Sequence, residues 1–113
     1  MNRPAENSIR KGKATAPFYA AAVALQARLA SLSYEALPHE DGLREEIILK
    51  DGRTGTIDVF VERREGECLC VVVQGFLPGK LLWFIRHAYV DGFRMLKGGT
   101  VVELESDQLY GYD

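Results

Sequence analysis

Apolar residues in the first third of the chain recur at the spacing of an α-helix. Aromatic and aliphatic side chains follow one another by four, three, four and three positions, which places them on one helix face: Phe18, Ala22, Leu25, Leu29 and Leu32. Pro17 stands where such a helix would begin, because its φ angle suits the first turn and its missing N–H has no partner there. We predict an amphipathic helix from about residue 15 to residue 33.

From residue 43 the pattern changes to that of β-strands. The segments LREEIILK (43–50) and TIDVFVER (56–63) flank the sequence DGRTG, and apolar and polar residues alternate along the second segment. Gly52 and Gly55 are predicted to supply the positive φ angles that a tight turn between these strands needs. This region therefore predicts a β-hairpin.

The strand pattern continues to the end of the chain. CLCVVVQ (68–74) is apolar without interruption, which predicts a central strand covered on both faces. Residues 93–105 predict a second hairpin with Gly98 and Gly99 at its tip. KLLWFIRHAYV (80–90) fits a strand or a short buried helix, and its aromatic and branched residues favour the strand. The predicted class is α+β, with one N-terminal amphipathic helix packed on an antiparallel β-meander of five or six strands.

The sequence GFLPGK (75–80) resembles a phosphate-binding loop but does not match the motif of such loops. The motif G-x-x-x-x-G-K-[ST] needs one more residue, a backbone donor where Pro78 stands, and a hydroxyl where Leu81 stands. We interpret it as a turn between two apolar strands and predict no nucleotide cofactor. Phe76 and Leu77 would then lie at a loop tip, where they are candidates for an interaction surface.

The richest collection of chemical groups is WFIRHAYVD (83–91). On a strand, alternation places four of its side chains on one face, where they could line a ligand cup: Trp83, His87, Tyr89 and Asp91. In that cup His87 would act as acid or base, and Asp91 would set its tautomer. The alternative is that this face packs under the helix and its polar members lie at the rim of the sheet.

Charge and composition narrow the classes of partner. The 113 residues are 47% hydrophobic and 27% charged, which is typical of one globular domain. Four basic residues and one acidic residue give residues 1–13 a charge of +3, which leaves −5 for residues 14–113 out of the total of −2. We expect residues 1–14 to form a flexible basic tail before a single domain over residues 15–113. The acidic body argues against nucleic acid as a partner.

The cysteines and the hydropathy of the chain indicate in which cellular compartment the protein is expected. Cys68 and Cys70 share one face of the predicted strand, and we interpret them as small buried hydrophobes rather than ligands of a metal, because few further ligands are available. No apolar run approaches the ~20 residues of a membrane span. We expect a cytoplasmic protein that binds no metal or membrane.

These observations favour a non-catalytic interaction module that forms a homodimer. One helix covers only part of one face of the predicted sheet, whereas residues 68–74 and 81–86 are apolar on both faces, so a second subunit is expected to cover the other face. The alternative function is a small-ligand-binding or enzymatic cup between the helix and a curved sheet. We assign no catalytic residue and expect no cofactor.

Overall fold

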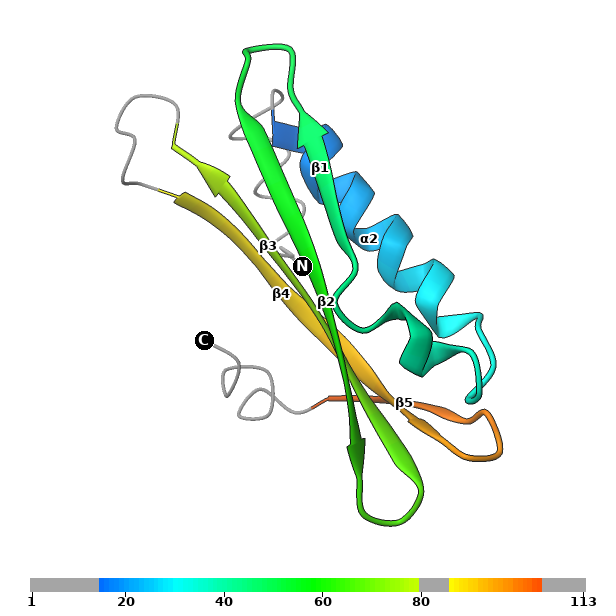
Figure 1. Cartoon of the computed structure of the whole chain (residues 1–113). Coiled ribbons are helices and arrows are strands. Elements are labelled where there is room, and N and C mark those ends of the chain that lie inside the picture. The colour runs from blue at the N-terminus through cyan, green and yellow to red at the C-terminus, as the bar shows by residue number, and fades with distance from the viewer. Residues whose placement is uncertain (1–14, 80–85, 105–113) are drawn as a thin grey trace, which may run out of the picture.

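The structure is a computed structural model that describes residues 15–79 and 86–104 (Figure 1). The predicted tail of residues 1–14 lies outside the described residues. In chain order, the elements are α2 (Ala16–Ala30), the 3-10 helix η2 (Leu37–Glu40), β1 (Arg44–Ile48), β2 (Thr54–Arg64), β3 (Cys68–Pro78), β4 (Arg86–Leu96) and β5 (Val101–Glu103).

The strands form one antiparallel sheet in the order β1-β2-β3-β4-β5, so each strand pairs with its neighbours in sequence. The central strand β3 pairs along its whole length with β4 and along most of its length with β2. The outer strand β5 is short and pairs only with Phe93–Met95 of β4. The prediction of an α+β fold with one helix on an antiparallel meander is confirmed.

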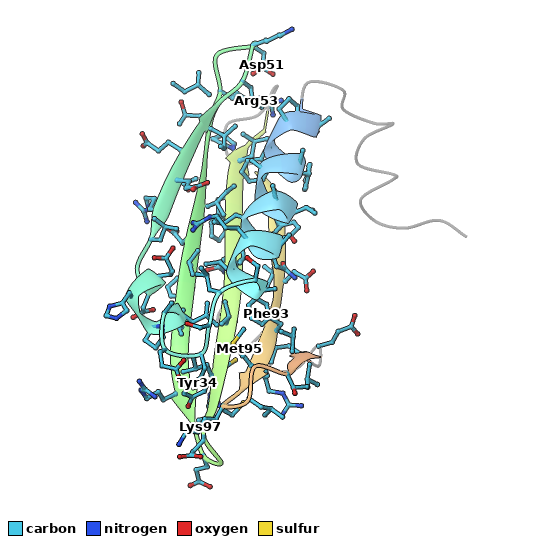
Figure 2. All side chains as sticks on the ribbon, turned by 90° about the vertical axis from the view of Figure 1, so that its right-hand side faces the viewer. Tyr34, Asp51, Arg53, Phe93, Met95 and Lys97 are labelled. Atoms are coloured by element: carbon cyan, nitrogen blue, oxygen red, sulfur yellow. The ribbon has the colours of Figure 1, made fainter. Side chains whose placement is uncertain are left out.

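The helix α2 lies along one face of the sheet, as Figures 1 and 2 show. Its predicted apolar stripe is the buried stripe, with Phe18, Ala22, Leu25 and Leu29 at most 4% exposed. These side chains pack on odd-numbered residues of the sheet: Ile57, Val59, Leu69, Val71, Val73, Leu77, Phe93 and Met95. The helix ends at Ala30, three residues before the predicted end. The core therefore lies between α2 and the odd-numbered face.

Two glycines make room for the ring of Phe18. A Cβ added to Gly55 would lie 2.6 Å from Cδ1 of Phe18, and one added to Gly75 would lie 2.8 Å from Cζ. Gly55 was predicted as a turn residue, and that prediction is wrong, because Gly55 lies within β2 and only Gly52 has the positive φ of the turn. The absence of a side chain at residue 55 serves the packing of the helix.

Arg53 fastens the β1–β2 turn to the end of β3. Its Nε donates to Oδ2 of Asp51 at 3.0 Å, and its Nη1 donates to the carbonyl oxygen of Pro78 at 2.9 Å. Figure 2 shows Asp51 and Arg53 at one end of the sheet and Lys97 at the other. These bonds explain how an arginine side chain in a turn is only 12% exposed.

We call the opposite side of the sheet the helix-free face, because no helix of the described residues packs on it. It carries the even-numbered residues of the strands. On β3 these residues are buried nevertheless: Cys68, Cys70, Val72 and Gln74. Val72 lies opposite Phe60 on β2 and Gly92 on β4, and the side chain of Leu104 lies over Gly92. The predicted burial of the central strand on both faces is confirmed.

Candidate functional site

A groove runs between α2 and the β4–β5 side of the sheet. Its volume is about 370 Å³, and both the helix and the strands line it. Its walls include Val23, Gln26, Ala27, Tyr89, Asp91 and Glu103. It forms because β5 is short and because small alanines on this flank of α2 leave space above β4.

Tyr89 is the best-positioned polar group in the groove. Its hydroxyl donates a hydrogen bond of 2.9 Å to Oε1 of Gln26, which joins β4 to the helix. Burial raises the pKa of Tyr89 to about 12, and the negative charge of Asp91 adds to the increase. The phenol therefore stays protonated at neutral pH, where it can donate a hydrogen bond and cannot act as a base.

Two carboxylates give the groove a negative charge. Oδ1 of Asp91 accepts a hydrogen bond of 2.8 Å from the backbone N–H of Gly92, and Glu103 lies on β5 nearby. Neither carboxylate forms an ion pair with a residue that the structure describes. Carboxylates beside an apolar wall that includes Val23 suit a ligand that has both a positive charge and an apolar body.

The structure brings together two of the four residues predicted for a ligand cup. Tyr89 and Asp91 lie on the helix-covered face of β4 and line the groove. His87 lies in β4 opposite Leu77, but its side chain is outside the described residues, and so is the whole of Trp83. The proposed His87–Asp91 pair therefore stays a prediction.

Gln26 was not predicted to take part in the site. The available signal was its position next to Leu25, at the border of the apolar stripe of the helix, where a polar side chain can reach across to the sheet. No sequence feature indicated Glu103, because its place beside the groove depends on how β5 pairs with β4.

Phe76 and Leu77 do not lie at a loop tip. Both belong to β3, where Phe76 is partly buried on the helix-free face and Leu77 is fully buried in the core. The interpretation of residues 75–80 as a turn is wrong for residues 75–78, because β3 continues through Pro78. A backbone extended as a strand pairs its N–H groups with neighbouring strands and does not wrap a phosphate.

Both cysteines are buried in β3 and form no disulfide bond, in agreement with their interpretation as small hydrophobes. Within residues 15–79 and 86–104, no group of three or more His, Cys, Asp or Glu side chains is placed to hold a metal ion. None of the helices described is long and apolar enough to cross a membrane.

No protein-family model matches this chain, and no curated protein or solved structure is significantly similar to it.

Proposed function

We propose that this protein is a non-catalytic interaction module that forms a homodimer through its helix-free face. The observation that carries the proposal is the apolar character of that face, on which no described helix packs. Apolar side chains lie on all five strands there, from Ile48 on β1 to Val102 on β5, and these two are 77% and 36% exposed. Exposed apolar side chains that adjoin a buried strip are typical of a surface that a partner covers.

The charges of this face support a second copy of the chain as the partner. Strand alternation places three basic and three acidic described side chains on it: Arg44, Arg64, Arg94, Glu46, Asp58 and Glu62. The body of the protein is acidic, so two copies repel each other over most of their surfaces. The described charges of this face cancel, and charges of both signs can pair across a two-fold axis, which reduces this repulsion.

Sedimentation velocity over a range of micromolar concentrations tests the dimer. We expect a dimer for the wild type and a shift to monomer for Ile48→Glu or Val102→Glu, because each substitution places a charge in the apolar contact. Val23→Glu is the matched control, since Val23 is also exposed but lies on the opposite side of the sheet. A wild-type protein that stays monomeric throughout would refute the proposal, as would equal loss of the dimer in the control.

We also propose that the protein acts in the cytoplasm. The chain has two cysteines, and they form no disulfide bond with each other. This supports a reducing compartment, where thiols persist.

The groove supports a second candidate function, the binding of a small ligand. The specific observation is the hydrogen bond between Tyr89 and Gln26, which places a fixed phenol in a hollow of about 370 Å³. A ligand of the matching chemistry is an aromatic or aliphatic primary amine. NMR titration with such amines, and with the corresponding alcohols as controls, should shift resonances of Gln26 and Tyr89 with the amines only. Equal response to the alcohols, or no response, would exclude this function.

A further inference from the structure

A second hollow lies on the helix-free face, near the β2–β3 turn. Its volume is about 360 Å³, and it is lined by Arg64, Glu65, Cys68 and Arg94. The strands bring Arg64 and Arg94 close together although they are far apart in the sequence. Cys68 of β3 pairs with Arg64 of β2 on one side and with Leu96 of β4 on the other. Arg94 lies two residues before Leu96, on the same face of β4.

Arg94 differs from the arginines that have a carboxylate partner. Arg28, Arg44 and Arg53 each form an ion pair of 3.1 Å or less. The guanidinium of Arg94 forms no hydrogen bond or ion pair within the part of the chain that the structure describes, and its Nε is completely buried. A buried donor without a partner destabilises a protein by about 1–3 kcal/mol. Such a group calls for an explanation, and an ion that accepts its hydrogen bond is one of those that chemistry offers.

The surroundings of Arg94 favour an anion. Arg64 provides a second guanidinium on the wall of the hollow. Its Nε lies 3.4 Å from Oε1 of Glu62. Cys68 contributes a small wall that is only 6% exposed. Glu65 is an exposed residue of the turn, so its charge is better screened by water than a charge inside the hollow.

We propose that this hollow binds a small oxyanion, either a phosphate or a carboxylate group, with Arg94 as the main ligand-binding residue and Arg64 in support. A guanidinium presents parallel N–H donors at the spacing of two oxyanion oxygens. Solvent does not reach Nε of Arg94 in the structure, so side-on binding requires the guanidinium to turn toward the hollow. This rotation of the side chain gives the buried Nε–H an acceptor and removes the free-energy cost of leaving that donor unpaired.

NMR and calorimetry of the full chain test the site at constant ionic strength. We expect inorganic phosphate or acetate to shift the Nε–Hε resonance of Arg94, whereas chloride leaves it unchanged. The response to phosphate compared with acetate identifies the preferred oxyanion. No shift of this resonance with either anion refutes the proposal, and this measurement needs no substitution.

Variants then assign the binding to the hollow. Arg94→Gln should weaken the binding of the anion by roughly tenfold or more, because it removes the charge and the paired donors. Arg94→Lys keeps the charge and should recover only part of that loss, and Arg64→Gln should have a smaller effect. The matched control is Arg63→Gln, since Arg63 is an exposed neighbour on the other face of β2. An equal loss in Arg63→Gln, or unchanged binding in Arg94→Gln and Arg64→Gln, overturns the assignment.

Discussion

The packing of Phe18 against the sheet gives the sharpest test of the structure. Replacing Gly55 with alanine adds a Cβ that lies 2.6 and 2.7 Å from two ring atoms of Phe18 and 3.2 Å from Cδ1 of Leu77. Optimal carbon–carbon contacts are about 3.5–4.0 Å, so the ring has to move by roughly 1 Å. It has little space to do so, because Gly75 lies against another edge of the same ring.

The size of the effect follows from the cost of overpacking a core. Inserting a methyl group into such a place costs about 1–3 kcal/mol. Alanine also restricts the unfolded chain, which offsets about 0.4–1 kcal/mol of that cost. We therefore expect Gly55→Ala to lower the free energy of unfolding by about 1–2 kcal/mol, which corresponds to a decrease in Tm of roughly 5–15 °C for a domain of this size.

Urea unfolding followed by circular dichroism measures this change, and a double-mutant cycle locates its cause. Phe18→Leu alone destabilises the core, but in its presence Gly55→Ala should cost little, which gives a coupling energy of about 1 kcal/mol. Gly98→Ala is the control, because a Cβ there meets no atom within 4 Å. If Gly55→Ala is as harmless as Gly98→Ala, or if the two substitutions at residues 18 and 55 are additive, the described packing is wrong.

Three further outcomes are expected. Leu29→Ala should cost about 2–5 kcal/mol in urea unfolding, because Leu29 is fully buried under the sheet, whereas Val23→Ala on the exposed side of α2 should change stability by no more than about 0.5 kcal/mol. Arg53→Ala should lower the free energy of unfolding by about 1.5–3 kcal/mol, because the hydrogen bonds to Asp51 and Pro78 are lost. Arg53→Lys should restore only part of this stability, and full stability in Arg53→Ala would show that these bonds are unimportant. The pKa of Tyr89 is raised from 10.0 to about 12 in the folded protein, so the unfolded chain loses the phenol proton at lower pH. The contribution of Tyr89 to stability is therefore complete below pH 10.0 and is lost as the pH rises to about 12. Comparison of the wild type with Tyr89→Phe in alkaline unfolding experiments measures that contribution, and identical pH profiles would contradict it.

Much of the fold was predictable because local patterns and tertiary packing agree. The spacing of Phe18, Leu25 and Leu29 fixes the buried side of α2, and the alternation around Ile57 and Val59 fixes the buried side of β2. The errors arose where the role of a residue depends on a distant one. Gly55 resembles a turn glycine in the sequence, but its conformation is that of a strand, and the reason for it is Phe18, far away in the chain.

The candidate sites were less predictable for the same reason. The alternation along residues 83–91 correctly placed Tyr89 and Asp91 on one face, but nothing local indicated that Gln26 would accept the hydrogen bond of Tyr89. Arg94 carried no signal at all. Its lack of a partner depends on the neighbours that β2, β3 and β5 supply, and those neighbours follow from strand register rather than from sequence spacing.

The order of the sheet has a consequence for how the chain folds during synthesis. Each strand pairs with the strand made just before it, so the hairpins can form one after another as the chain leaves the ribosome. The helix α2 is made before the strands, yet Phe93 and Met95 of β4 belong to the same core. The apolar stripe of α2 is therefore incompletely covered until β4 emerges. A nascent chain stalled before residue 86 would display that stripe, and we expect molecular chaperones to bind this intermediate and to release the chain once β4 has joined the sheet.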